Sequence, residues 1–590
     1  MAYEVNFGTM RVATSKPAAK KTGRFRIALL GDFSARANSG KLDTGAELGG
    51  RKPLKVDCDN VDATIKRLGV KLRLPLGADG GAVELAVNSM DDLHPDQLYS
   101  NLPIFSELSG LRQRLKTQST FAKAAKEVQA WAGVKIAPPP RRKPRSAVIP
   151  ANGKLSDFAR LVGAPTVKAK PTVSIAEMLK QMVGPYVVPA KDPRQDQLVA
   201  TVDSALAATM RTVLHHPDFQ SFEALWRSVD MLVRRLETDE KLQIVLYDVT
   251  AEEIAADLSK ADALENSGLY KLLVEQPAMD AAQGPLAVVI GNYLFEQTPP
   301  HAELLGRVAK IVAQTQTAFI AGVGTSCLDT KPGDLHPLIK EAWDALAEMP
   351  EAAYVGLVAP RFMLRNPYGE QTDPIDSFDF EEFTPQAGLS GMLWGNSAVI
   401  AGLLLGATFG QQGDKMKPGS VLSIGDMPFY YYTDSDGDQT ALPCTERMLS
   451  SRMAELVSKH RFMPMLSIKA QPEVRLGGFG SLAGGLLAGS WKPVTESSTE
   501  PAAEPEAPAE EKSETAEEAP AESAEAPGES AVETEPAAET PASDPELDKL
   551  LADLNPEPAA EEVKAEEAAP TAEAEPEMDP ELAKLLKELG

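Results

Sequence analysis

Apolar and polar positions in the first part of the chain follow the spacings of strands and helices in turn. The run FRIALLGDF is almost continuously apolar and predicts a buried strand that ends at Gly31 and Asp32. Further patterns predict a helix running into a strand, another strand and a helical stretch, at 61–72, 81–87 and 98–133. We expect these elements to form one domain over residues 25–136, preceded by a flexible arm at 1–24.

Strand-like and helical patterns alternate again over residues 174–493. Strands are predicted in KLQIVLYDV, PLAVVIGNYLF, AFIAGV and YVGLVAPRFML. Helical spacing lies before, between and after them, at 196–237, 303–316 and 445–460. This alternation predicts a second α/β domain, so the fold class of the body is mixed α/β. A hairpin turn is predicted at Asp436 and Gly437, which separate two strand-like runs.

The most apolar run of the chain, AVIAGLLLGATF at 398–409, predicts a buried helix. A helix that crosses a bilayer needs about twenty apolar residues, and this run is too short. The start of the chain shows no apolar core of a secretory signal. Cys58, Cys327 and Cys444 lie far apart without a CxxC pair, which favours a reducing compartment. We therefore expect a cytoplasmic protein that is not inserted in a membrane.

Two segments lack the spacing of regular elements. APPPRRKPR, at 137–145, is too rich in proline for a helix interior or a central strand. We interpret residues 137–173 as a Pro-rich, basic linker and spacer. Residues 494–590 are dominated by Ala, Pro, Glu and Ser and contain no Phe, Tyr or Trp. Such a composition cannot bury enough apolar surface to order the backbone, so this segment is predicted to be a disordered acidic tail.

Nearly all of the net charge lies in this C-terminal segment. Residues 494–590 contain 30 Asp and Glu, 5 Lys and no Arg, which accounts for about −25 of the net charge of −26. The rest of the chain is close to neutral. It offers no basic surface of the kind that nucleic acids require, so we expect no nucleic-acid partner.

One ten-residue phrase occurs twice in the acidic segment. PELDKLLADL and PELAKLLKEL each follow an Asp, so 544–554 and 579–589 both begin with a helix-capping residue and Pro at the first helical position. The leucines of each copy form one apolar stripe at helical spacing. These leucines are Leu547, Leu550, Leu551, Leu554, Leu582, Leu585, Leu586 and Leu589. We expect two short helical motifs that dock on a partner, and chance duplication in a low-complexity tract is the alternative.

Candidate catalytic patterns fail on their context. His215 and His216 are adjacent and point in different directions on a helix, so they are poorly placed to bind one metal ion. DSDGDQ lacks the Gly and Glu positions of a calcium loop, and GFGSLA at 478–483 is not followed by a βαβ unit. We expect neither enzymatic activity nor a bound metal or cofactor. A catalytic site built from residues far apart in the sequence remains the alternative.

Several stretches resemble the contractile sheath of bacterial type VI secretion systems. GRFRIALLGDFSAR, RKPLKVDCDNVDATIKRL and VNSMDDLHPDQLYSNLPIFSELSGLRQRL resemble, in this order, the small sheath subunit. The second domain resembles the large subunit. The matching stretches include MRTVLHHPDFQSFEALWRSVDMLVRRLET, PLAVVIGNYLF, YVGLVAPRFMLRNPYGEQTDPIDSFDFEEF, LWGNSAVIAGLLL and TERMLSSRMAELVSKHRFMPMLS.

The resemblance implies that two subunits, separate in that family, are fused in this chain as two closely packed α/β units of a contractile-sheath-like body. It further implies a homo-oligomeric helical tube around an inner needle, with inner-tube and baseplate proteins and a recycling unfoldase as partners. In the family, the large subunit continues into a segment that links neighbouring subunits, whereas here the match fades before the acidic tail. A soluble adaptor with a sheath-derived fold, which recruits partners through the two leucine motifs, is therefore a second hypothesis.

The matched stretches also contain candidate structural residues. Arg361 and Arg365, with Tyr368, are spaced to pair with the carboxylates of FDFEEF. The residues proposed for this assembly network are Arg361, Arg365, Tyr368, Asp379, Glu381 and Glu382, with Trp226 and Trp394 as apolar anchors. An internal network and a contact between subunits are both compatible with the sequence.

Overall fold

The computed structural model describes most of the chain before the acidic tail. The described residues are 5–10, 23–76, 81–130, 195–261, 263–280, 284–433 and 437–491. They belong to one compact unit, Met1–Ser498. The predicted linker at 137–173, the acidic tail and both leucine motifs lie outside the described residues, as do the hairpin residues 434–436 and the side chain of Cys327.

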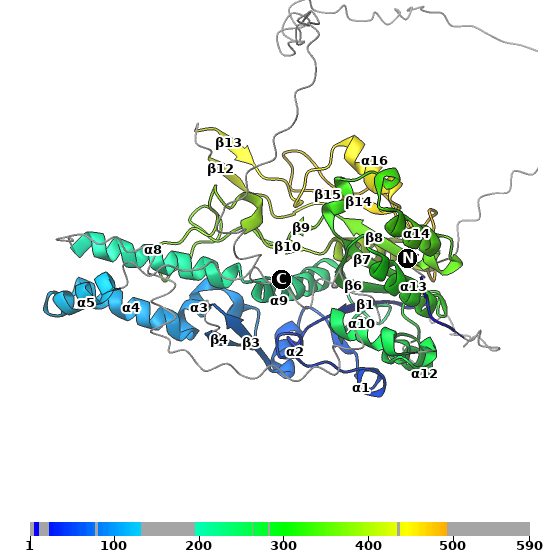
Figure 1. The fold of residues 1–590 in the computed structure, drawn as a ribbon, viewed down its shortest axis with the longest axis horizontal. Helices are drawn as coiled ribbons and strands as arrows, with labels where there is room; N and C mark the ends of the chain where they lie inside the picture. The colour runs from blue at the N-terminus through cyan, green and yellow to red at the C-terminus, as the bar shows by residue number, and fades with distance from the viewer. Residues whose placement is uncertain are drawn as a thin grey trace, which may run out of the picture. The chain divides into compact units, whose positions relative to one another are not determined.

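A twisted mixed sheet forms the centre of the fold (Figure 1). In the described part of the chain it has nine strands. Their order is β11 (Ser423–Ile424), β15 (Val474–Leu476), β14 (Met463–Ser467), β8 (Val355–Ala359), β7 (Ala318–Val323), β6 (Val288–Phe295), β1 (Phe25–Gly31), β5 (Leu242–Asp248) and β2 (Leu54–Val56). The six strands β14, β8, β7, β6, β1 and β5 run parallel to one another. At the edges, β2 pairs antiparallel with β5, β15 with β14, and β11 with β15.

Strand β1 comes from the first predicted domain but lies in the middle of this sheet. It pairs with β5 from Phe25 opposite Leu242 onward, and with β6 from Ile27 opposite Val288 onward. Its side chains alternate between the two hydrophobic cores, because Ile27 packs on one face of the sheet and Ala28 on the other. A strand buried on both faces explains why FRIALLG is apolar at almost every position.

Helices cover both faces of the sheet. One face carries α9 (Pro217–Arg235) and α15 (Ser397–Gln412), and the other α10 (Ala251–Lys260), α13 (Pro299–Ala313), α14 (Pro337–Ala347) and α16 (Ser451–Lys459). Helix α8 (Gln195–Leu214) precedes α9 and packs against it. The prediction of a mixed α/β fold is confirmed. The buried helix predicted in AVIAGLLLGATF is α15, whose residues from Ser397 to Gly406 are all buried.

The first domain adds a helical layer against α8. Its elements are α2 (Val61–Leu68), β3 (Val70–Pro75), β4 (Ala82–Val87), α3 (Pro95–Asn101), α4 (Pro103–Lys116) and α5 (Gln118–Ala130). Strands β3 and β4 form an antiparallel pair, and α4 packs against both α5 and α8. The helix-to-strand pattern predicted at 61–72 and the strand predicted at 81–87 are thereby confirmed.

The helical tract predicted at 196–237 consists of two helices. Helix α8 ends at Leu214, and α9 begins at Pro217, whose missing N–H suits the first helical position. The Nδ1 atom of His216 accepts a hydrogen bond of 3.2 Å from the backbone N–H of Asp218 and so caps α9. His216 therefore has a local structural role.

Shorter elements complete the described chain. They are α1 (Ala46–Gly49), α11 (Gly268–Tyr270), α12 (Gln276–Met279), the pair β9 (Phe362–Met363) and β10 (Trp394–Gly395), and the hairpin β12 (Tyr431–Thr433) and β13 (Gln439–Ala441). The hairpin strands flank the predicted turn at Asp436 and Gly437. GFGSLA, at 478–483, lies in an irregular segment after β15, with no helix following it in the described residues.

Candidate functional site: the junction of the two sequence regions

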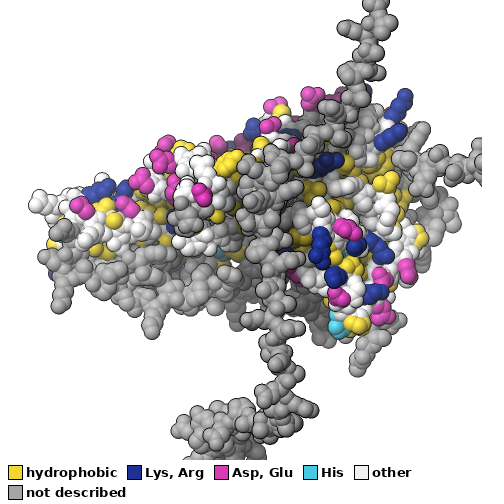
Figure 2. Space-filling model, turned by 90° about the horizontal axis from the view of Figure 1, so that it is seen from above, with side chains coloured by type: hydrophobic (Ala, Val, Ile, Leu, Met, Phe, Trp, Pro, Cys, Tyr) yellow, Lys and Arg dark blue, Asp and Glu magenta, His cyan; other side chains and the backbone are white. Residues whose placement is uncertain are grey.

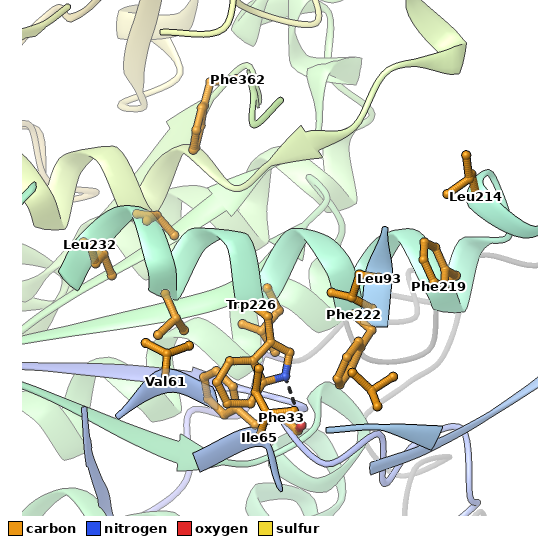
Figure 3. Packing of buried hydrophobic residues seen from close by; sticks show 14 of the residues in the cluster. Phe33, Val61, Ile65, Leu93, Leu214, Phe219, Phe222, Trp226, Leu232 and Phe362 are labelled. Carbon is orange, nitrogen blue, oxygen red and sulfur yellow. Dashed lines mark hydrogen bonds between the residues drawn. The ribbon is translucent and has the colours of Figure 1, made fainter. Parts of the chain in front are cut away.

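The two predicted domains share one hydrophobic core, and Trp226 lies where they meet. This side chain of α9 is fully buried and points toward Phe33 and Ile65 of the first region (Figure 3). Its indole N–H donates a hydrogen bond of 3.2 Å to the backbone carbonyl of Phe33, and the two rings pack edge to face. The close approach of α9 also requires Gly31, since a Cβ there would lie 2.8 Å from Leu225.

A buried cluster of arginines and carboxylates joins the regions at the carboxyl ends of β1 and β5. Glu253 of α10 is completely buried and accepts hydrogen bonds of 2.7 and 2.5 Å from the Arg51 guanidinium. Arg36 donates a further bond of 3.3 Å to the same carboxylate, and Arg36 and Arg51 both contact Asp43. Both arginines come from the first region, so the charge of Glu253 is compensated across the junction.

The start of α10 also orients the Glu253 carboxylate, independently of the arginines. Thr250 caps α10 by accepting a bond of 3.1 Å from the Glu253 backbone N–H, and Glu253 in turn accepts one of 3.0 Å from the Thr250 N–H. This capping box is visible in the sequence as TAEE. The helix start therefore orients the acid that the first region binds.

Asp32 and Asp248 lie at the same edge and carry unusual pKa values. Burial, together with the nearby charge of Asp248, raises the pKa of Asp32 to about 7, against hydrogen bonds from the backbone N–H groups of Arg36 and Ala37. Burial also raises the pKa of Asp248, although Ser34 donates two hydrogen bonds to its carboxylate. The negative charge of these two carboxylates is thus costly at this edge. Side-chain and backbone groups of the first region donate hydrogen bonds to both carboxylates.

Open α/β sheets usually bind ligands at their carboxyl edge, where the strand order reverses. In the order β5-β1-β6-β7-β8 the reversal lies between β1 and β6. On the other side of β1, at the end of β5, the guanidinium of Arg51 donates to the Asp248 backbone carbonyl at 2.5 Å and to Glu253. The chain's own residues therefore occupy the edge beside β1 and β5.

A second buried network surrounds Arg365. Its guanidinium donates to Glu382 at 2.6 and 3.1 Å and to Glu223 of α9 at 2.7 and 3.3 Å. The ring of Tyr368 lies 4.2 Å from the same guanidinium, and its hydroxyl accepts a bond of 2.8 Å from Arg227. The network fastens the segment after β9 onto α9.

Glu382 is ionised in this network. Burial, the largest single influence, disfavours its charge, but Arg365 and His215 together outweigh burial and lower the pKa of Glu382 to about 2. The Nε2 atom of His215 lies 3.4 Å from the carboxylate. The Tyr368 backbone N–H donates a bond of 2.9 Å to Glu382, which is 1% exposed at its side chain.

The first region reaches this network through α3. Asp96 accepts hydrogen bonds from the backbone N–H groups of Asp376 and Ser377, at 3.2 and 3.0 Å, and from the Ser377 hydroxyl at 2.5 Å. The ring of His94 packs edge to face on Tyr368 with 5.1 Å between the ring centroids. The segment that carries Tyr368 is thus held by both sequence regions.

The remaining candidates from the sequence lie elsewhere. Arg361 pairs with Glu446, with Nη2 2.6 Å from Oε2, and Asp379 is exposed. Glu381 is also exposed and accepts a bond of 2.9 Å from the Glu370 backbone N–H. Trp394 is half-buried in a small satellite cluster of apolar side chains, where its indole N–H donates to a backbone carbonyl at 3.0 Å.

Sequence reasoning missed several members of both networks. Glu223 and Asp96 are single acidic residues in helical patterns and carry no signal of their partners. Arg51 and Glu253 are 202 residues apart in the chain, so only the fold brings them together. The TAEE capping box marks Glu253 as a helix start but not as an arginine ligand.

The described part of the predicted N-terminal arm lies along α13. Arg307 donates to the Asn6 backbone carbonyl at 3.0 and 3.2 Å, and Lys310 donates to the Gly8 carbonyl at 2.8 Å. Phe7 packs so closely on Gly306 that a Cβ there would lie 2.2 Å from its ring. These contacts join the N-terminal arm to the second region.

Neither a metal centre nor a membrane span is visible in the part of the chain that the structure describes. No three His, Cys, Asp or Glu side chains in that part are arranged to hold a metal ion. No helix in it is both long and apolar enough to cross a bilayer.

The fold and its buried junctions define a mixed α/β body in which two sequence regions fold as one unit. Residues 9–130 match the family described as type VI secretion system VipA, and residues 196–483 match the EvpB tail sheath N-terminal domain, VipB. A curated relative from Pseudomonas aeruginosa strain PAO1, named "Type VI secretion system sheath protein TssC1", is 32% identical over 290 residues. The match covers 46% of this chain and 58% of that relative, so this chain spans little more than half of the relative's length.

The chain therefore belongs to the type VI secretion sheath family and carries small-subunit-like and large-subunit-like regions in one polypeptide. The resemblance seen in the sequence is confirmed on both sides of the predicted linker. The boundaries of the matches agree with the described chain, since the first ends with α5 and the second begins with α8.

Proposed function

We propose that this chain is a structural subunit of a type VI secretion-like contractile sheath. Copies assemble in the cytoplasm of the producing cell into a helical tube around an inner needle. Contraction of this tube drives protein secretion. The observation that carries the proposal is the pairing of both sheath-family regions in one chain, with β1 of the first region between β5 and β6 of the second.

The buried junctions give the fusion a physical purpose. Without the first region, β5 and β6 would lose the strand between them, and Glu253 would lose its arginines. An unpaired buried carboxylate is strongly destabilising. A covalent link supplies one first region for each second region and raises their effective concentration for each other. Equal stoichiometry is what a helical lattice of identical units requires.

A structural role also fits the chemistry of the junctions. At the carboxyl end of β5, Arg51 is engaged by groups of the chain itself, the Asp248 carbonyl and the carboxylates of Glu253 and Asp43. Contraction needs no bound cofactor in this scheme, because energy is stored in a metastable packing of subunits and is released when interfaces rearrange. Inner-tube proteins, baseplate proteins and a recycling unfoldase are the partners that we propose besides other copies of this chain.

Surface charge on the body is mixed. On the face that Figure 2 shows, Lys and Arg lie interspersed with Asp and Glu and do not form a field of one sign. A surface of this kind can make many complementary contacts with identical neighbours, whereas a nucleic-acid partner would favour a basic stripe.

Electron microscopy of the purified full-length chain tests the proposal, with particle size checked by sedimentation. We expect tubes or rings with a regular lateral repeat. A monodisperse monomer or dimer under all conditions that support assembly would overturn the sheath function and favour the adaptor. A variant with β1 interrupted, Leu29→Pro, serves as the control that loses both folding and assembly.

A further inference from the structure

A cavity of about 220 Å³ lies between α14 and α16. Apolar side chains line its inner part, because Trp343, Leu346 and Leu482 are 7, 0 and 2% exposed. Three cations lie on its rim. Lys340 is in the first turn of α14, Lys459 is the last residue of α16, and Arg461 follows α16. The cavity thus combines an apolar floor with a cationic rim.

The rim charges are accessible to a ligand. The side chains of Lys340, Lys459 and Arg461 are 55, 61 and 43% exposed. Among the described residues that line the cavity, Asp344 is the single acid, and it lies 2.8 Å from Lys340 and 3.8 Å from Arg461. Lys459 in turn pairs with Glu455 at 2.8 Å, so three rim cations are offset by two carboxylates and one positive charge is in excess. The lining favours a ligand with negative charge.

Two further groups at this place point to a peptide. Gln297 lines the cavity, and its buried Oε1 atom accepts no hydrogen bond from any residue that the structure describes. Such an acceptor suits a ligand with an N–H donor. Leu486 is 67% exposed. It lies in the same loop as Gly484, where an added Cβ would be 3.9 Å from Nε of Arg461. An exposed apolar side chain beside the rim extends the apolar contact area.

We propose that this cavity binds residues 544–554 of a second copy of the chain. This segment, DPELDKLLADL, carries four acidic residues and one Lys together with four leucines. A leucine fills the apolar floor, and the carboxylates pair with the rim cations. The second copy of the phrase, 579–589, carries three acidic residues and two Lys, so it complements the rim less well.

Charge complementarity favours this occupant over a generic apolar partner. The acidic segment holds about −25 of the net charge of the chain, whereas the rest is close to neutral, so a local excess of cations has its complement in the same polypeptide. When a tail segment of one copy binds the cavity of another, the two chains are linked by a weak contact. Many such contacts in an assembly add up to stronger overall binding. The proposal does not rest on the contractile function, because it holds whether or not tubes form.

Fluorescence anisotropy of a labelled 544–554 peptide tests the proposal. The receptor is the full-length chain in which the eight motif leucines are changed to serine, so that its own copies do not compete. We expect saturable binding that weakens as NaCl rises from about 0.05 to about 0.5 M, and weaker binding of a 579–589 peptide. A 544–554 peptide with serine at its four leucine positions is expected not to bind.

Reversal of the rim charges locates the binding site. We expect the receptor variant Lys340→Glu, Lys459→Glu, Arg461→Glu to bind the 544–554 peptide about tenfold more weakly. Reversal of three exposed cations outside the cavity, Lys66→Glu, Arg67→Glu and Lys417→Glu, is the matched control and should leave binding unchanged. Equal affinity of the rim variant and the parent receptor, or no binding of the peptide at all, would overturn the proposal.

Discussion

Arg365 and Glu382 form an ion pair that is almost completely withdrawn from solvent. Their closest atoms, Nη1 and Oε2, lie 2.6 Å apart, and the side chains are 10 and 1% exposed. The same guanidinium holds Glu223 of α9 at 2.7 Å. Arg365 therefore pairs with two buried carboxylates, of which Glu223 also binds Arg227 at 2.7 Å, and it fixes the segment between β9 and β10 to α9. Since removal of one partner leaves charge without compensation, the network is a sensitive point of the fold.

The variant Arg365→Met tests the energetic weight of this network. It retains much of the side-chain volume but removes the arginine of Glu382 and leaves Glu223 paired with Arg227 alone, so we expect the free energy of unfolding to fall by about 3–5 kcal/mol. Urea unfolding followed by circular dichroism measures this difference. Arg361→Met is the matched control, because Arg361 is 39% exposed and its pair with Glu446 should contribute no more than about 1 kcal/mol. Similar losses in the two variants would contradict the burial argument.

The stability of the chain should depend on pH through Asp32. Its carboxyl has a pKa of about 7 in the folded chain and 3.8 as the ordinary value, so folding favours the protonated form. This contribution is fully present below about pH 4 and is lost as pH rises through 7, by at most about 4 kcal/mol. Asp248, whose pKa is also raised, acts in the same direction.

Thermal unfolding between pH 4.5 and pH 8 measures this dependence. We expect the melting temperature of the parent chain to decline over this range and the decline to be smaller in Asp32→Ala. This pH range lies above the one in which Glu382 acts in the opposite direction. Because the pKa of Glu382 is lowered to about 2, its protonation destabilises the fold only below pH 4.5. An identical slope in both chains would show that Asp32 does not titrate as the geometry requires.

The two tryptophan anchors should differ in their contribution to stability. Trp226 is fully buried at the junction and hydrogen-bonded to the Phe33 carbonyl, whereas Trp394 is half-buried in a satellite cluster. We expect Trp226→Ala to lower the free energy of unfolding by about 3–5 kcal/mol. Trp394→Ala should lower it by about 1–2 kcal/mol, because less surface returns to water. Denaturant titration of both variants decides the order, and the reverse order would place the shared core elsewhere.

Cleavage of the chain in the predicted linker should leave the body intact. A protease site introduced near residue 150 separates the regions covalently, but β1 remains hydrogen-bonded to β5 and β6 and Arg51 to Glu253. We expect the two fragments to co-elute in size-exclusion chromatography without denaturant and to separate in about 6 M urea. Dissociation in buffer alone would mean that the junctions are too weak to hold the regions together.

The local elements of this protein follow from the pattern of its residues. The almost continuously apolar run FRIALLG predicts a buried strand and AVIAGLLLGATF a buried helix, because such side chains are stable away from water. Order and spacing of the matched stretches also identified the family of both regions. Arg365 and Glu382 were within reach of sequence reasoning, since they lie only 17 residues apart.

The way in which the two regions combine depends on contacts between distant parts of the chain. Nothing in FRIALLG specifies that β1 lies between β5 and β6, because a strand buried on both faces has the same pattern beside any pair of neighbours. The partners Arg51 and Glu253, and Arg365 and Glu223, are separated by 202 and 142 residues, and a single charged residue carries no mark of its distant partner. Burial selects which of the many possible ion pairs form, because only pairing compensates the cost of removing charge from water, and burial exists only once the chain has folded.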